Sequence, residues 1–144
     1  MRCRDIMTKN VKTCRENCSV KDAVQIMNDY NCGFVPVINK DNQISGVVTD
    51  RDIAIHALLD GKDPEQMKVG EFMTKSVISA HPNDDIDLAI RKMKENKVRR
   101  IPVVDDNNKV VGIISLGDLA VLSGEEHETF EALETISSPV SSAK

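Results

Sequence analysis

The chain has 144 residues, of which 40% are hydrophobic and 29% are charged, and this is the composition of a folded globular protein. It holds no apolar run near the roughly 18 residues that a membrane-spanning helix needs, so we expect no membrane protein. The net charge of −4 lies within residues 125–144, and the neutral remainder argues against a nucleic-acid-binding or membrane-binding surface.

In chain order, the first half predicts a strand, a helix, a β-hairpin and a second helix. Apolar residues within 20–27 recur at helical spacing, which indicates an amphipathic helix. Two β-branched runs, Phe34–Ile38 and Ile44–Thr49, flank an Asn/Asp turn and predict a hairpin. A second helix is expected over about Asp50–Leu59, and apolar positions near Val11 could add a strand.

The second half predicts the same elements in the same order. Residues 86–93 repeat the helical spacing, and the runs Ile101–Val104 and Val110–Ser115 repeat the hairpin. A helix is expected over about Leu116–Ser123, and a strand could lie near Val77. Each half therefore reads β-α-β-β-α, and the fold class is α+β.

The two halves are duplicates in register. Pro102 follows Pro36 by 66 residues, and the motif at 46–52 returns without a gap at 112–118. A unit of about sixty residues is marginally stable alone, so we expect the two to pack as one pseudo-twofold module.

This repeat defines the domain organisation that we expect. The first repeat with its linker takes residues 1–66, and the second takes residues 67–124. Residues 125–144 form an acidic tail with five glutamates and one lysine, which we expect to be partly helical and partly flexible.

The pattern resembles the CBS domain, and two such repeats in tandem resemble a Bateman module. The resemblance covers about residues 5–122 and is carried by Gly-apolar-apolar-Thr/Ser-x-x-Asp, by the Pro-Val step and by the Met-Thr pair, each present twice. It implies α+β subunits, two clefts between the repeats, a homodimer formed through helices and a regulatory role with adenosine-containing ligands. A pair without an output domain is similar to small bacterial and archaeal CBS-pair proteins.

The hydroxyl and the carboxylate of the repeated motif are the main candidate site. Thr49 and Ser115 lie where a strand passes into a helix, and Asp52 and Asp118 follow three residues later. A carboxylate suits the two hydroxyls of a ribose, and the resemblance places this Asp there. The alternative is a capping box, which stabilises the helix without any ligand, and both roles can coexist.

Basic residues distinguish the two repeats. Arg99 and Arg100 directly precede the strand in the second repeat, at a position where the family often carries phosphate-binding residues. Their counterparts, Gly33 and Phe34, are uncharged, so the cleft with Asp118 is expected to be the better nucleotide site. The alternative for the arginines is a solvated basic helix end.

The remaining expectations concern the ligand and the setting. Gly46 and Gly112 could let a ligand approach closely or could only serve a bend in the strand. The ligand is expected to be AMP, ADP or ATP, with S-adenosylmethionine or NAD next, and no cofactor is required. We find no catalytic motif and expect no enzyme, and without the apolar core of a signal peptide we expect a cytoplasmic protein that acts on an unknown partner.

Two other functions stay open. The first is a ligand-free dimeric scaffold whose acidic tail contacts a partner. The second is a metal or redox sensor built on the cysteines, although no Cys-x-x-Cys occurs and two cysteines match small or apolar residues in the second repeat. The candidate residues are Cys3, Cys14, Cys18, Cys32, His56 and His81.

Overall fold

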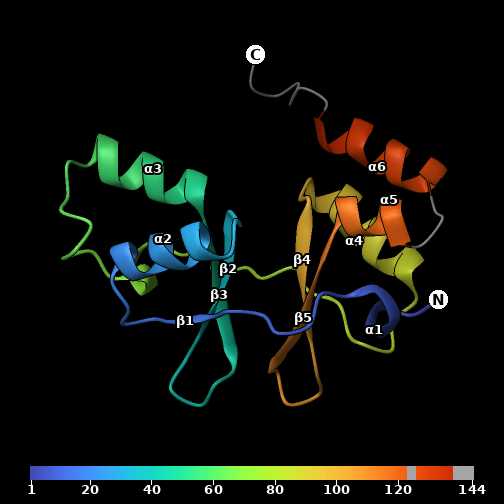
Figure 1. Cartoon of the computed structure of the whole chain (residues 1–144), viewed down its shortest axis with the longest axis horizontal. Coiled ribbons are helices and arrows are strands. Elements are labelled where there is room, and N and C mark those ends of the chain that lie inside the picture. Colours follow the sequence, from blue (N-terminus) through green and yellow to red (C-terminus); the bar gives the residue numbers. More distant parts are fainter. Residues whose placement is uncertain (123–125, 138–144) are drawn as a thin grey trace. The chain divides into compact units, whose positions relative to one another are not determined.

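The computed structural model describes residues 1–122 and 126–137 (Figure 1). The chain forms two compact units, each of which draws on separate parts of the sequence. The repeat-1 unit consists of Val11–Val77 and Asn107–Val110. The repeat-2 unit consists of Met1–Asn10, Ile78–Asp106 and the chain from Val111 onward. The expected division at residues 66/67 and 124/125 stays a prediction.

The repeat-1 unit contains a three-stranded sheet with two helices. The sheet has the order β1-β2-β3, in which β1 pairs parallel with β2, and β2 pairs antiparallel with β3. The predicted hairpin and both predicted helices are confirmed, and the strand expected near Val11 lies three residues later. The elements are β1 (Cys14–Arg15), α2 (Val20–Asp29), β2 (Phe34–Ile38), β3 (Ile44–Thr49), α3 (Asp50–Leu59) and a 3-10 turn, η1 (Val69–Glu71).

The repeat-2 unit has the same plan with additions at both ends. Its hairpin and helices again confirm the prediction, and a parallel bridge between Ala80 and Val103 replaces the first strand. The acidic segment forms a helix, while the part of the predicted tail at 138–144 lies outside the described residues. The elements are α1 (Cys3–Ile6), α4 (Ile86–Asn96), β4 (Arg100–Val104), β5 (Val110–Ser115), α5 (Leu116–Leu122) and α6 (Glu126–Ser137).

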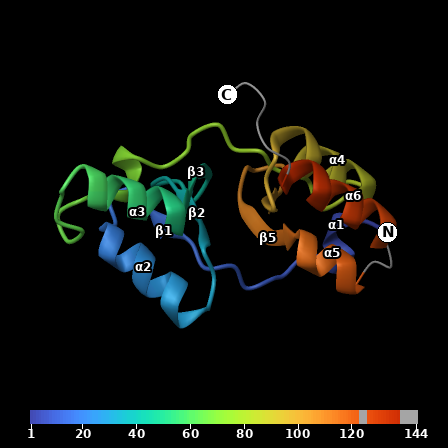
Figure 2. The same ribbon diagram turned by 90° about the horizontal axis from the view of Figure 1, so that it is seen from above.

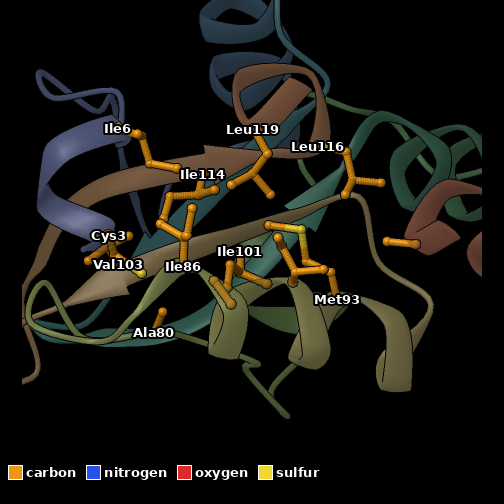
Figure 3. Close-up of a cluster of buried hydrophobic side chains, with 13 residues drawn as sticks. Cys3, Ile6, Ala80, Ile86, Met93, Ile101, Val103, Ile114, Leu116 and Leu119 are labelled. Atoms are coloured by element: carbon orange, nitrogen blue, oxygen red, sulfur yellow. The ribbon is translucent and has the colours of Figure 1, made fainter. Parts of the chain in front are cut away.

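Each unit has its own hydrophobic core between its helices and its hairpin. In the repeat-2 unit Met93, Ile101, Ile114 and Leu119 are fully buried (Figure 3). The repeat-1 core is built from register partners of these residues, Met27, Val35, Val48 and Ile53. Equivalent residues of the two repeats therefore form two separate hydrophobic cores.

The opening segment of each repeat docks on the hairpin of the other repeat. Thr8 pairs with Ile113 of β5, with N···O distances of 2.9 and 3.0 Å. Thr74 pairs in the same way with Val47 of β3, at 2.8 and 3.0 Å. This exchange explains why residues 1–10 belong to the repeat-2 unit, and why residues 67–77 belong to the repeat-1 unit.

The C-terminal helix covers the helical face of the repeat-2 unit. Figures 1 and 2 both show α6 lying along α4 and α5, and it packs against both. Ala132 of α6 is fully buried in the repeat-2 core. Within the described residues, none of these helices combines the length and the apolar character needed to cross a membrane.

Candidate functional site

The repeated motif of the first half forms a capping box at the start of α3. Thr49 ends β3 and is the N-cap residue of the helix. Its Oγ1 accepts a hydrogen bond from the Asp52 backbone N–H at 3.2 Å, and Asp52 Oδ2 accepts one from the Thr49 N–H at 3.3 Å. The pair therefore satisfies two backbone donors that the first turn would otherwise leave open.

The second half repeats this geometry closely. Ser115 Oγ accepts from the Asp118 N–H at 3.1 Å, and Asp118 Oδ2 accepts from the Ser115 N–H at 3.3 Å. All four residues are partly buried. The capping function expected as an alternative is thus present in both repeats. An ionised carboxylate offers about four acceptor positions, so the cap leaves acceptor capacity for a ligand hydroxyl.

The two motif glycines make room for a methionine. A Cβ atom on Gly46 would lie 2.6 Å from Met73 Sδ and 2.9 Å from the Thr74 carbonyl oxygen. A Cβ atom on Gly112 would lie 2.5 Å from Met7 Sδ. In both hairpins the close approach is made by the docked Met-Thr segment, which accounts for the glycines within the chain itself.

The two arginines lie beside the second capping box. The Arg99 carbonyl accepts a hydrogen bond from the Leu116 N–H at 3.0 Å, so the entry to β4 lies against the start of α5. The Arg99 guanidinium donates to Ser137 Oγ of α6 at 3.3 Å. Arg100 is exposed at the first position of β4. The structure thus brings Arg99, Arg100, Ser115 and Asp118 into one region of the repeat-2 unit.

Sequence reasoning missed a groove on the repeat-1 unit, which we call the α2–α3 groove. Its volume is about 530 Å³, and it lies between the two helices. A signal for it exists in the 66-residue register, because exposed Asp50 takes the place of buried Leu116. The groove is lined by Val24, Met27, Asn28, Asn31, Cys32, Gly33, Asp50, Ile53 and Ala54.

The cysteines divide into two buried and two partly buried thiols. Burial is the main cause that raises the pKa of Cys3 to about 11 and that of Cys14 to about 12, so both thiols are protonated at neutral pH. Cys14 is 3% exposed, and its register partner Ala80 is also 3% exposed. Cys14 therefore packs as a small apolar residue in the repeat-1 core.

The two candidate histidines each pair with a carboxylate. His56 Nδ1 lies 3.2 Å from Asp60 Oδ2, and its ring packs 5.3 Å from the ring of Phe72. His81 Nε2 lies 2.9 Å from Asp106 Oδ1. Within residues 1–122 and 126–137, no group of three or more His, Cys, Asp or Glu side chains is arranged to hold a metal ion.

The chain matches a known family over most of its length. The family model of the CBS domain matches residues 3–58 and 69–124. The chain is 37% identical over 134 residues to the CBS domain-containing protein YhcV of Bacillus subtilis, which covers 93% of this chain and 94% of YhcV.

Solved structures of CBS pairs share the fold. The CBS domain pair of protein MJ0100, in complex with 5-methylthioadenosine and S-adenosyl-L-methionine, has a TM-score of 0.77, 31% identity and coverage of 88% of this chain and 98% of that chain. CBSX2 in complex with AMP has a TM-score of 0.73, 27% identity and coverage of 88% and 98%. Hypoxic Response Protein I, with two coordinated zinc ions, has a TM-score of 0.76, 32% identity and coverage of 83% and 97%.

Proposed function

The chain belongs to the CBS-domain family, and from this premise we propose that it is a regulatory module that binds an adenosine-containing ligand. AMP, ADP or ATP is the first choice, and S-adenosylmethionine or NAD is the next. Binding shifts the conformation of the module, and a partner protein senses the change. The AMP complex of CBSX2 and the S-adenosylmethionine complex of the MJ0100 pair support this choice of ligand class.

The observation that carries the proposal is the repeated pairing of a hydroxyl and a carboxylate at a helix start. In each repeat one carboxylate oxygen fastens the helix, through the bonds between Asp52 and Thr49 and between Asp118 and Ser115. The other oxygen is then held in a fixed direction by the cap. Preorganised acceptors of this kind suit the 2′ and 3′ hydroxyls of a ribose.

In this proposal the arginines of the repeat-2 unit bind the phosphate groups of the ligand. Arg100 is exposed beside the second capping box, and its guanidinium can hold two phosphate oxygens at once. Arg99 would have to release Ser137 to take part. The repeat-1 unit has Gly33 and Phe34 at these positions, so the site with Asp118 binds the more anionic ligand.

The proposal includes a homodimer in the cytoplasm and a regulated partner whose identity is open. Regulation requires no cofactor beyond the ligand. The second candidate function is a ligand-free dimeric scaffold, which the capping boxes favour because they account for both carboxylates without a nucleotide.

Thermal unfolding with and without ligands tests the proposal. A ligand at 100 times its dissociation constant stabilises the folded state by about 2.7 kcal/mol. For a chain of this size the melting temperature should rise by roughly 5–10 °C. AMP, ADP, ATP, S-adenosylmethionine and NAD are compared with zinc chloride. A shift with zinc alone, abolished by Cys14→Ser, would instead favour the metal sensor.

Two matched variants locate the site. Loss of a hydrogen bond to a charged group costs roughly 1.5–3 kcal/mol, so Asp118→Ala should weaken nucleotide binding about ten- to hundred-fold in calorimetric titrations. Asp52→Ala should weaken it less. A larger effect of Asp52→Ala would reverse the ranking of the two sites. No stabilisation by any of the adenosine compounds would leave the scaffold as the better explanation.

A further inference from the structure

The acidic helix α6 lies over basic residues of the repeat-2 unit. Figure 2 shows α6 beside α4, and two of its side chains contact cations. Glu131 bonds with Lys94 of α4, and Ser137 Oγ accepts a hydrogen bond from the Arg99 guanidinium at 3.3 Å. Ser137 is the last residue of α6, so the negative end of the helix dipole lies at the same cation. The end of α6 therefore gives Arg99 a partner of the kind that a phosphate group would be.

The apolar contact that holds α6 in place is small. Among residues 130–137, whose exposure the structure describes, Ala132 alone is buried, and an alanine side chain buries little apolar surface. Ile136 is partly buried against the same core, whereas Phe130 is 66% exposed. A helix of 12 residues is marginally stable without tertiary contacts. A modest change in these contacts can therefore release α6.

A phosphate group at Arg99 would meet negative charge on α6. Residues 130–137 carry Glu131 and Glu134, and the last turn of the helix holds no basic residue. Glu134 is a neighbour of Ser137 on the helix surface, one turn before it. A phosphate that takes the guanidinium from Ser137 adds like charge beside these carboxylates and the helix dipole, and like charges repel. The bound phosphate and the docked helix therefore destabilise each other.

We propose that α6 is an acidic cover of the phosphate site, and that a phosphate group bound at Arg99 releases α6 from α4 and α5. The inference rests on the proposed function, because it takes an adenine nucleotide as the source of the phosphate. Release uncovers part of the core cluster to which Ala132 belongs, and so gives the regulated partner a surface that depends on the ligand. The exposed residues Ile55, Leu58 and Leu59 of α3, on the repeat-1 unit, stay available to the homodimer.

Hydrogen exchange of the full chain measures the release of α6. We expect ATP, at a concentration that saturates binding in calorimetry, to speed the exchange of amides 130–137 about three- to ten-fold. Adenosine has the same ribose without a phosphate group and should not speed this exchange. The amides of α2, in the repeat-1 unit, serve as the internal control and should not exchange faster with either compound.

Ala132→Asp tests the same coupling from the other side. A charge at this buried position should detach α6. By linkage the variant should then bind ATP more tightly than the native chain, by the factor with which ATP speeds exchange. The added negative charge acts against phosphate binding, so it cannot produce this gain. The matched control Phe130→Asp places the same charge on the exposed side of α6 and should leave the dissociation constant within about two-fold.

Ser137→Ala is a second variant, for the case that Ala132→Asp changes the circular dichroism spectrum of the folded chain. It removes the acceptor of the Arg99 guanidinium from an exposed position, where the substitution cannot disturb the core. The Arg99 side chain is then available to the phosphate, and ATP should bind about two- to three-fold more tightly.

Three results would overturn the inference. The first is ATP binding in calorimetry with unchanged or slower exchange of α6. The second is equally fast exchange of α6 with adenosine, since the phosphate would then not be responsible. The third is ATP binding that neither Ala132→Asp nor Ser137→Ala tightens. The proposed function fails in a different way, because neither the native chain nor any variant would then bind ATP at all.

Discussion

The two units have the same arrangement of helices and strands, but they differ in what covers their helical faces. Each has the same capping box, the same glycine under a methionine and the same buried hairpin. The repeat-2 unit covers its helices with α6, while the repeat-1 unit leaves a groove edged by Asp50. The features that the fold requires are thus the same in both repeats, whereas the outer helical faces differ in sequence and in what covers them.

Exchanging the residues at positions 50 and 116, which are equivalent in the two repeats, should give the largest effect on stability. Leu116→Asp places a charge at a buried position under α6, where Leu116 is 6% exposed. An acid in the first turn gains a fraction of a kcal/mol from the helix dipole, but loss of the buried leucine and desolvation of the charge should cost about 3–5 kcal/mol. Urea denaturation measures the free energy of unfolding. The reciprocal Asp50→Leu should change it by less than about 1 kcal/mol, and equal losses would contradict the comparison.

Gly46 and Gly112 should differ in how well they tolerate substitution by alanine. Gly46→Ala brings a Cβ atom to 2.9 Å from a backbone oxygen as well as to 2.6 Å from Met73 Sδ, so the strand itself must move. We expect a loss of about 1–3 kcal/mol in thermal unfolding. Gly112→Ala meets only Met7, at 2.5 Å from Sδ and 2.9 Å from Cβ. The sulfur can rotate away whereas the Cβ can move only with its backbone, so we expect a loss that is smaller than that of Gly46→Ala. A second change, Met7→Ala, removes the Cγ and Sδ contacts but keeps the Cβ contact, so it should relieve the Gly112→Ala variant in part. No relief at all would show that the backbone is the main obstacle there too.

The buried thiol of the repeat-1 core should make stability depend on pH above 9. The pKa of Cys14 is raised from 9.0 to about 12, mainly by burial, so the folded state holds the proton more tightly than the unfolded state. The free energy of unfolding is therefore constant below about pH 9 and falls between about pH 9 and 12, by at most about 1.4 kcal/mol per pH unit for this group. Denaturation at pH 8, 9 and 10 measures this slope. Cys14→Ala, which installs the residue of the second repeat, should reduce it, while an unchanged slope would assign it to Cys3 or to other groups.

The smallest effect on stability should come from the exposed edge of the contact between α4 and α6. Lys94→Asn installs the residue of the first repeat and removes the pairing with Glu131. Both side chains are substantially exposed, so the loss should be about 0.2–1 kcal/mol in chemical denaturation. Asn28→Lys on the open face serves as the control and should change stability even less. A loss well above 1 kcal/mol for Lys94→Asn would mean that the pair positions α6 and does more than mark its edge.

The longer helices and the hairpins could be predicted because the hydrophobic pattern of each occurs twice in the sequence. Helical spacing within 20–27 and 86–93 and the paired β-branched runs gave α2, α4 and both hairpins with nearly the observed limits. The four-residue α1 and the turn η1 were missed, because such short elements depend on tertiary contacts, such as the bond from the Cys3 N–H to the Asp84 carbonyl at 2.8 Å.

The capping boxes of the candidate site could be predicted from the sequence, but the segments around them could not, and the ligand-binding function of the site stays a prediction. The spacing of Thr49 and Asp52 predicted the capping box, and the register showed that Arg99 and Arg100 have uncharged counterparts in the first repeat. The sequence did not predict the methionine that contacts each glycine, or the packing of α6 on α4 and α5. Both are contacts between segments far apart in the chain, and no local pattern specifies them.

The reciprocal docking of Thr8 on β5 and of Thr74 on β3 means that each unit is completed by the opening segment of the other repeat. No single cut between the repeats can release two intact halves, because each fragment would carry away the strand partner that its sibling needs. A lone repeat could complete itself only by borrowing that segment from a second molecule. Fusion of the repeats turns such borrowing into an intramolecular reaction, which is independent of protein concentration.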